Sequence, residues 1–141
     1  MAMTVFESSV KTLKANRKPV HRYLSDLRNF ESLIPEGRVR NLEIEGDSCR
    51  FTIDGVGEMR VRKVPGNDEG SVRFESENSK PFRFDLSIEL VEAAGSNTEM
   101  KLVLSAELNM MMKMMARKPL RDGVEMVASI LTEELNQKEL G

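Results

Sequence analysis

Residues 109–135 form the segment that most constrains the fold, because they are numerous and periodic enough to build a major helix. Beyond an opening run of methionines, apolar residues recur at spacings of three and four, which places them on one face of a helix. These residues are Leu120, Val124, Val127, Leu131 and Leu135, widened by Ala128 and Ile130 and flanked by Met126. A helix with so broad an apolar face must pack against a large surface elsewhere in the chain.

Residues 39–108 supply that surface, because their apolar pattern has a period of two and is interrupted at intervals by turn residues. The pattern predicts six strands, at 39–45, 49–53, 56–64, 72–77, 82–91 and 98–108. Asp54-Gly55 between two alternating runs is a strong hairpin signal, because both central positions of that turn require positive φ. We therefore expect a meander of antiparallel strands.

The strands predicted at 82–91 and 98–108 show which face of the sheet is buried. Apolar residues occupy every second position, namely Phe82, Phe84, Leu86, Ile88 and Leu90, then Met100, Leu102, Leu104, Ala106 and Leu108. The positions between them are mostly charged or small and polar. This alternation is typical of an antiparallel sheet that is covered on one side only, and the C-terminal helix is the expected cover.

The N-terminal region predicts a strand followed by two short helices. Residues 4–13 alternate, with Phe6, Ser8, Val10 and Thr12 on one side. Asn16 is expected to cap the first helix, with Pro19 in its first turn. Asp26 is expected to cap the second, whose apolar residues are Phe30, Leu33 and Ile34 and which ends at Pro35-Glu36-Gly37.

Length and composition exclude several classes of protein. The 141 residues fit one domain, 1–141, and no apolar run reaches membrane-spanning length. The N-terminal MAMTVFESS lacks the features of a secretory signal, so we expect a cytoplasmic protein. The net charge of −2 gives no basic field for nucleic acid. One cysteine and one histidine cannot form the usual zinc sites, and we expect neither a metal nor a cofactor.

The segments FESSVKTL, VHRYLSDLRNFESLIP and KPLRDGVEMVASILTEEL, together with the meander, resemble the START-like, or SRPBCC, superfamily. Birch-pollen-allergen-like and polyketide cyclase/dehydrase-like proteins belong to it. The resemblance implies an α+β helix-grip fold, in which a seven-stranded curved antiparallel sheet wraps around the long C-terminal helix. It also implies that the two short helices close one end, and that an apolar ligand binds between sheet and helix.

Alternation identifies the residues expected to line such a site. The sheet offers Phe51, Met59, Val61, Phe74, Phe84, Leu86, Leu102 and Leu104, the helix offers Val127 and Leu131, and the methionine run offers Met111 and Met115. For any one of them ordinary core packing is the commoner role, and as a set they form an apolar lining. The inward polar candidates are Ser8, Thr12 and Ser76, with Thr52 if the strand register slips. A lining of this kind is typical of sites for apolar ligands.

The methionine run itself is open to three interpretations. Met110, Met111, Met112, Met114 and Met115 fall within six positions. Flexible thioether side chains suit the mouth of a variable pocket, and they suit the packing of a junction between strand and helix equally well. If exposed, they would mark a contact with a protein partner or a second copy of the chain.

Candidates for acid–base catalysis are weak, because such chemistry needs an ionisable group beside the reacting atom. Alternation turns Glu58, Glu75, Asp85 and Glu89 outward, where they are expected to pair with neighbouring arginines, and places His21 off the buried stripe, at the surface. Cys49 begins an inward alternation and is expected to be a buried, inert thiol.

The leading hypothesis from the sequence is a protein that binds or transports a lipid-like or polycyclic hydrophobic molecule. A polyketide cyclase/dehydrase-like enzyme is one alternative, and it requires an ionisable residue inside the fold. The other is an interaction module of the chaperone-activator type, with a homodimer or protein contact through Met110 to Met115.

Overall fold

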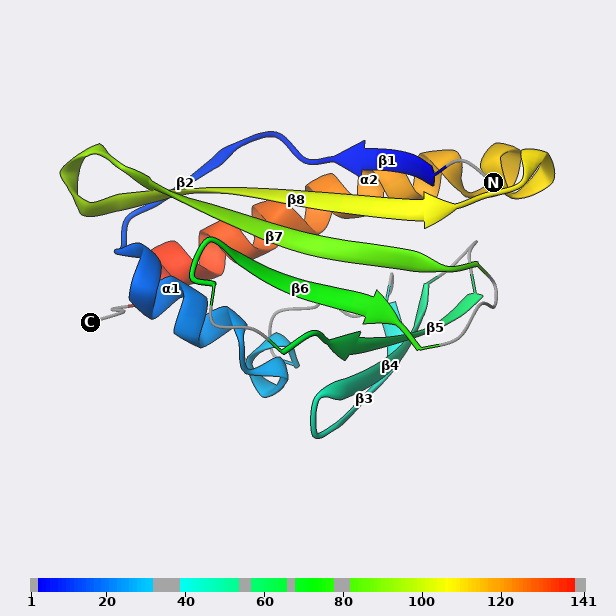
Figure 1. The fold of residues 1–141 in the computed structure, drawn as a ribbon, viewed down its shortest axis with the longest axis horizontal. Coiled ribbons are helices and arrows are strands. Elements are labelled where there is room, and N and C mark those ends of the chain that lie inside the picture. Colours follow the sequence, from blue (N-terminus) through cyan, green and yellow to red (C-terminus); the bar gives the residue numbers. More distant parts are fainter. Residues whose placement is uncertain (1–2, 32–38, 54–56, 66–67, 78–81, 139–141) are drawn as a thin grey trace.

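The computed structural model describes residues 3–31, 39–53, 57–65, 68–77 and 82–138, which form one curved antiparallel sheet and the helices that cover it (Figure 1). The strands are β1 (Met3–Glu7), β2 (Lys11–Leu13), β3 (Val39–Glu45), β4 (Ser48–Ile53), β5 (Gly57–Lys63), β6 (Ser71–Ser76), β7 (Phe84–Ala93) and β8 (Asn97–Glu107). The helices are α1 (Arg17–Leu24), η1 (Leu27–Phe30), η2 (Ala94–Ser96) and α2 (Met110–Gln137). All six strands predicted in the meander are present.

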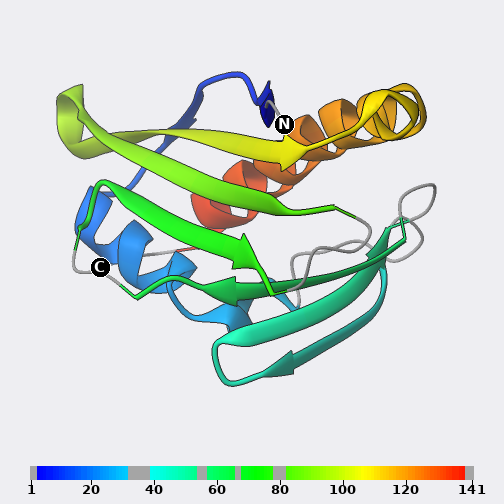
Figure 2. The ribbon, with the colours of Figure 1, turned by 45° about the vertical axis from the view of Figure 1, so that its right-hand side comes forward.

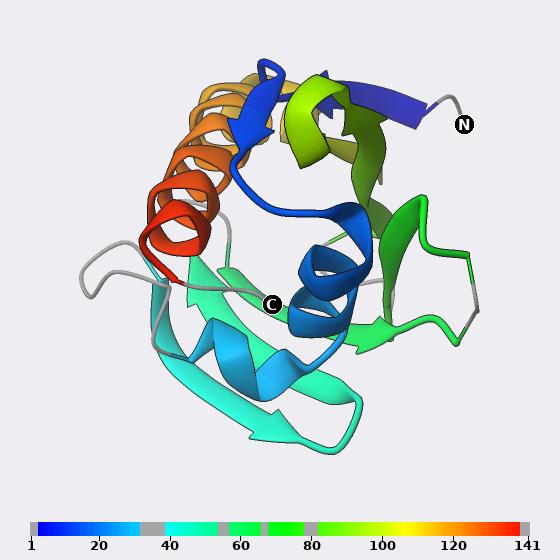
Figure 3. The same cartoon turned by 90° about the vertical axis from the view of Figure 1, so that its left-hand side faces the viewer.

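The sheet has the strand order β1-β8-β7-β6-β5-β4-β3, and β2 pairs with β8 beyond the end of β1. α2 lies on the concave side and packs mainly against β1, β2 and β8 (Figure 2). Viewed from one end, the sheet curves from β1 round to β3, and α1 and η1 lie at that end of the concave side (Figure 3). This is the predicted helix-grip arrangement. Among the described residues, no helix is both long enough and apolar enough to cross a membrane.

The register of β7 on β8 accounts for the burial of the predicted apolar face. Phe84 pairs with Ala106, Ile88 with Leu102, and Leu90 with Met100, all antiparallel. Each of these six side chains is buried. The hairpin is closed by η2, where Gly95 has φ +73, a conformation that a residue with a side chain rarely adopts. The turn predicted at Asp54-Gly55 lies outside the described residues.

The first strand differs from the prediction, because residues 4–13 do not form one continuous strand. β1 ends at Glu7 and β2 begins at Lys11, so the sheet has eight described strands rather than seven. Phe6 and Ser8 are buried as predicted, but Val10 is 58% exposed. Thr12 is also exposed and Leu13 is buried in its place. The break has shifted the alternation by one residue.

Of the two helix caps that the sequence predicted, Asp26 is confirmed and Asn16 is not, and Asn109 is a third cap that was not predicted. The Asp26 side chain accepts a hydrogen bond from the backbone N–H of Arg28, at 3.0 Å, and caps η1. Asn109 accepts one from the backbone N–H of Met112, at 2.8 Å, and starts α2. Asn16 precedes α1 as predicted, but its side chain makes no capping hydrogen bond. The predicted apolar residues Leu33 and Ile34 lie outside the described residues.

The convex face of the sheet carries the predicted cross-strand ion pairs. Arg62 of β5 pairs with Glu75 of β6, and Arg50 of β4 pairs with Glu43 of β3. Arg50 also approaches Glu58 of β5 at 4.0 Å. The charged residues therefore face solvent, and the opposite, concave face is left to apolar side chains.

Candidate functional site

The concave face is lined by the apolar residues that alternation singled out, and most of them are fully packed. The buried ones are Met59, Val61, Phe74, Phe84, Leu102, Leu104 and, on α2, Leu131. Phe51, Leu86 and Val127 pack against this core but are only partly buried. Seven of the predicted lining residues are thus core, and the other three are partly buried at its edge.

Leu86 is the most informative of the three, because it lies in the middle of the sheet. Its neighbours across the strands are Phe74 on β6 and Leu104 on β8, both buried. Along its own strand Phe84 and Ile88 point to the same face and are buried too. Leu86 is nevertheless only partly buried, which indicates room beside it above the concave face.

α2 has a partly exposed strip, formed by Gly123, Val127 and Ile130, which recur at spacings of four and three on one face of the helix. All three are partly exposed. A Cβ atom added to Gly123 would meet no heavy atom within 4 Å, so the space beside this residue is empty of protein. The fully buried stripe of α2 runs alongside and consists of Ala116, Leu120, Val124, Ala128, Leu131 and Leu135. Val127, predicted to belong to that stripe, lies at its edge instead.

The end of the concave side next to α1 is closed by aromatic packing. Phe30 of η1 meets Phe74 of β6 edge to face, with ring centroids 6.0 Å apart. Val20 and Leu24 of α1 and Leu27 of η1 are buried behind this contact. The two short helices therefore close one end, as the resemblance implied.

Polar groups in the interior are few and mostly engaged with the backbone. Within the described residues, Ser8 and Thr98 are the buried polar side chains. The Ser8 hydroxyl accepts a hydrogen bond from the Leu102 backbone N–H, at 2.9 Å, and donates to the carbonyl of Ser9. Thr98, which the sequence reasoning missed, donates to the carbonyl of Ala15 at 2.7 Å. These two hydroxyls tie the first residues of the chain to β8.

Ser76 is the predicted inward polar residue with spare hydrogen-bonding capacity. It is partly buried, and its hydroxyl oxygen accepts a hydrogen bond from the Phe84 backbone N–H at 3.1 Å. Its hydroxyl hydrogen has no acceptor among the residues that the structure describes. Thr52 instead pairs with Glu58 on the convex side and does not face inward.

Ionisable groups lie around the concave face rather than on it, as far as the structure describes the chain. Glu58, Asp85 and Glu89 are exposed. His21 is partly buried rather than at the surface as predicted, with Nε2 3.2 Å from the carbonyl oxygen of Ser71. It joins α1 to β6. Cys49 is buried as predicted, and burial raises the pKa of its thiol to about 11, so the reactive thiolate is disfavoured.

Glu125 on α2 carries the largest electrostatic perturbation, and it lies at the break between β1 and β2. Its carboxylate accepts hydrogen bonds from the Ser9 backbone N–H at 2.8 Å and from the Ser9 hydroxyl at 2.9 Å. Lys11 Nζ lies 2.8 Å from the same carboxylate. The hydrogen bond with Lys11, followed by that with the Ser9 backbone, lowers the pKa of Glu125 to about 2. The cluster fixes α2 to the sheet.

The methionines that were expected to line the site lie elsewhere. Met111 and Met115 are 70% and 60% exposed, so they do not contribute to the concave face. Met112 is the member of the run that packs against the core. No group of three His, Cys, Asp or Glu side chains within the described residues is arranged to hold a metal ion.

Comparisons with known proteins identify the fold. No protein-family model matches the chain, and a search of curated proteins finds no match. Solved structures do match. One is norcoclaurine synthase from Thalictrum flavum in complex with dopamine and hydroxybenzaldehyde. It superposes with a TM-score of 0.77 at 12% sequence identity, over 97% of this chain and 88% of that one. A protein of Thermus thermophilus superposes with a TM-score of 0.72 at 20% sequence identity, over 94% of this chain and 97% of that one. A START superfamily protein from Mycobacterium smegmatis superposes with a TM-score of 0.67 at 13% sequence identity, over 97% of this chain and 99% of that one.

These similarities extend over nearly the whole chain, and at such low identity they establish the fold alone. The predicted likeness to START-like and birch-pollen-allergen-like proteins is confirmed at that level, since a START superfamily protein and Ara h 8 are both among the matching structures.

Proposed function

We propose that the protein binds a small hydrophobic molecule between the concave face of the sheet and α2. The observation that carries this proposal is the partial exposure of Leu86 in the middle of an otherwise buried face. The empty space beside Gly123 on α2 supports it. An apolar guest in this space would remove apolar surface from water, which contributes about 25 cal/mol for each Å² buried.

The side chains around this space suit an aromatic, polycyclic or lipid-like molecule. Phe51 is partly buried and can offer its ring to a guest, Phe74 and Phe84 belong to the packed core around it, and the remaining lining is aliphatic or thioether. Ser76 adds one hydroxyl that can donate to a single acceptor on the guest. Norcoclaurine synthase, which has this fold, is seen with dopamine and hydroxybenzaldehyde, so the fold can accommodate small aromatic molecules.

The cyclase/dehydrase-like alternative remains a prediction without structural support of its own. It requires an ionisable side chain against the ligand, and the buried polar residues within the described part of the chain are Ser8 and Thr98. Both hydroxyls are engaged with the backbone. The likeness to norcoclaurine synthase concerns the fold and assigns no reaction.

Substitution of Gly123 tests the binding proposal, because the position offers both a blocking variant and a matched control. Gly123→Phe would place a ring in the open space, whereas Gly123→Ala adds one methyl group that meets nothing. Alanine is favoured over glycine within a helix by up to about 1 kcal/mol, so the control should be at least as stable as the wild type. The readout is fluorescence titration with the hydrophobic dye ANS, alongside circular dichroism and urea unfolding.

We expect Gly123→Ala to bind ANS like the wild type and Gly123→Phe to bind it at least tenfold more weakly while remaining folded. Equal binding by both variants would overturn the proposed site. Native mass spectrometry of gently purified protein, followed by organic extraction, should then identify a natural hydrophobic ligand. A Leu86→Trp variant offers a second block from the sheet side if Gly123→Phe fails to fold.

A further inference from the structure

The first two turns of α2 expose an unusual concentration of methionine. Met110, Met111, Met114 and Met115, here called the methionine tip, are 79%, 70%, 80% and 60% exposed. The tip lies at the end of α2 remote from α1, where the helix projects beyond β8 (Figure 1 and Figure 2). Isolated exposed apolar residues are ordinary, but a contiguous cluster marks a contact surface.

The same part of the helix is strongly cationic. Residues 109–121 contain Lys113, Arg117, Lys118 and Arg121 and no acidic residue. All four cations are exposed. Arg121 has an ion pair, with Asp122 at 3.8 Å, whereas the other three have none with any described residue. Because the whole chain has a net charge of −2, the positive charge is concentrated at one end of a molecule that is otherwise acidic.

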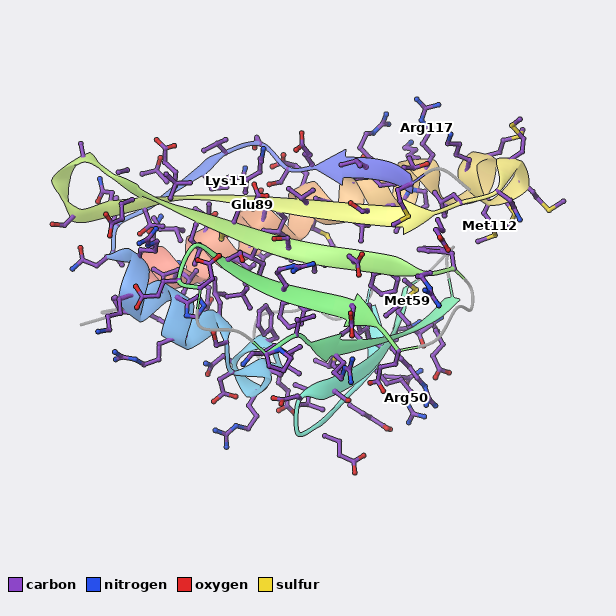
Figure 4. The ribbon with its side chains drawn as sticks, viewed as in Figure 1. Lys11, Arg50, Met59, Glu89, Met112 and Arg117 are labelled. Carbon is purple, nitrogen blue, oxygen red and sulfur yellow. The ribbon has the colours of Figure 1, made fainter. Side chains whose placement is uncertain are left out.

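The order of these residues along the helix places the methionines ahead of most of the cations. With a rise of 1.5 Å per residue, Lys118 lies about 10 Å farther along the axis than Met111. Figure 4 places Arg117 and Met112 in this same part of α2, with the Arg117 side chain directed away from the sheet. Helices that lie in the plane of a membrane surface bury their apolar residues roughly 5 to 10 Å into the boundary between lipid headgroups and acyl chains, and the same depth is taken here for a helix that enters by its end. Insertion of the methionine tip to that depth leaves Arg117 and Lys118 at the level of the phosphates.

We propose that the methionine tip and its cations form a docking site for the surface of an anionic lipid membrane. A stable protein interface needs about 800 Å² from each partner, whereas the methionine tip is confined to the first two turns of one helix. A membrane requires only inserted apolar side chains and unpaired positive charge, and both are present. The acidic remainder of the chain would be repelled by the same surface, which orients the tip toward it. The proposal does not depend on ligand binding inside the fold.

Vesicle sedimentation tests the electrostatic part. The protein is mixed with vesicles of phosphatidylcholine containing about 30% phosphatidylserine, or of phosphatidylcholine alone. Each cation near an anionic surface strengthens binding about fivefold, so R117Q/K118Q should weaken it about 30-fold. R73Q/R83Q is the matched control, because it removes two exposed cations from β6 and the entry to β7. It should bind like the wild type.

The apolar part can be followed with tryptophan fluorescence, since the chain contains no Trp. A Met111→Trp variant should shift its emission to the blue on phosphatidylserine vesicles. Val91→Trp, at a position 58% exposed near the far end of β7, should show no shift. M111S/M114S should weaken sedimentation with the vesicles and leave the unfolding midpoint unchanged.

Failure to bind either vesicle, or equal binding to both, would overturn the proposal. Wild-type affinity in both R117Q/K118Q and M111S/M114S would do so as well. A dimer in light scattering that dissociates in M111S/M114S, with no vesicle binding by the wild type, would assign the tip to a second copy of the chain instead.

Discussion

Replacing Glu125 by glutamine should lower the free energy of unfolding by about 1 kcal/mol at pH 7. The carboxylate holds Lys11 Nζ at 2.8 Å and the Ser9 backbone N–H at 2.8 Å. The amide oxygen of glutamine can still accept the hydrogen bond from the Ser9 backbone, so the substitution removes the charge and the second acceptor oxygen, which faces Lys11 and the Ser9 hydroxyl. Lowering a pKa from 4.5 to about 2 would be worth about 3 kcal/mol at full strength. The Glu125 side chain is 44% exposed, however, and measured exposed pairs contribute about 1 kcal/mol or less.

The pH dependence of this difference has a defined sign. The pKa of Glu125 is lower in the folded state than in the unfolded chain, so the stabilisation is fully present above the unfolded value of about 4.5. It is lost as the pH falls through the folded value of about 2. Wild type and Glu125→Gln should therefore differ at pH 7 and converge between pH 4.5 and pH 2.

Urea unfolding followed by circular dichroism measures both quantities, and a double-mutant cycle with Lys11→Met isolates the ion pair. The two single variants should each lose stability, and the double variant should lose less than their sum at pH 7. A difference between wild type and Glu125→Gln that is the same at pH 7 and at pH 2.5 would refute the electrostatic account. It would assign the effect to packing.

Three further substitutions or treatments probe other parts of the fold. Ser8→Ala should cost about 1 to 3 kcal/mol in urea unfolding, because it leaves the buried Leu102 N–H without its acceptor; no loss would contradict that hydrogen bond. Asn109→Ala should cost about 1 kcal/mol through loss of the α2 cap, whereas Asn16→Ala, whose side chain caps nothing, should have little effect. Iodoacetamide at pH 8 should modify Cys49 slowly in the folded protein and rapidly in urea, since burial raises its pKa to about 11, and equal rates would contradict its burial.

The meander could be predicted closely because its information is local. Each hairpin places its turn residues between two alternating runs, and the alternation identified the buried face, on which Phe84 pairs with Ala106 and Leu90 with Met100. β3 was predicted with its observed bounds, Val39–Glu45, for the same reason.

The break in the first strand could not be predicted, because its cause is distant in the sequence. Ser9 gives its backbone N–H to Glu125, which is 116 residues away, instead of to a neighbouring strand. No feature of residues 4–13 signals this, and their alternation alone favours one continuous strand. The inward assignments of Val10 and Thr12 failed as a consequence.

The candidate site was predictable in its residue types but not in its shape. Alternation identified Leu86 as inward-facing, yet its partial exposure depends on the spacing between the sheet and α2, which no local pattern encodes. Gly123 was overlooked because a glycine within a helix indicates only a weak position, and its importance here is the empty space beside it. Met111 and Met115 were assigned to the ligand site because methionines are concentrated in this segment. In the structure both side chains are exposed on the first turns of α2.

The anchoring of α2 explains how one helix can serve the core and still expose an apolar tip. Its later turns are fixed to the start of the chain by Glu125 and by Asn136, whose side chain accepts from the Lys14 N–H at 2.7 Å and donates to the Thr12 carbonyl at 3.2 Å. The methionine tip makes no comparable hydrogen bond to the described strands, and Pro119, which lacks an N–H, interrupts the helical hydrogen bonds between the two parts. Fold stability therefore resides mainly in the later turns. Substitutions at Met111, Met114, Arg117 and Lys118 should alter surface contacts without unfolding the protein, which is what makes the membrane proposal testable.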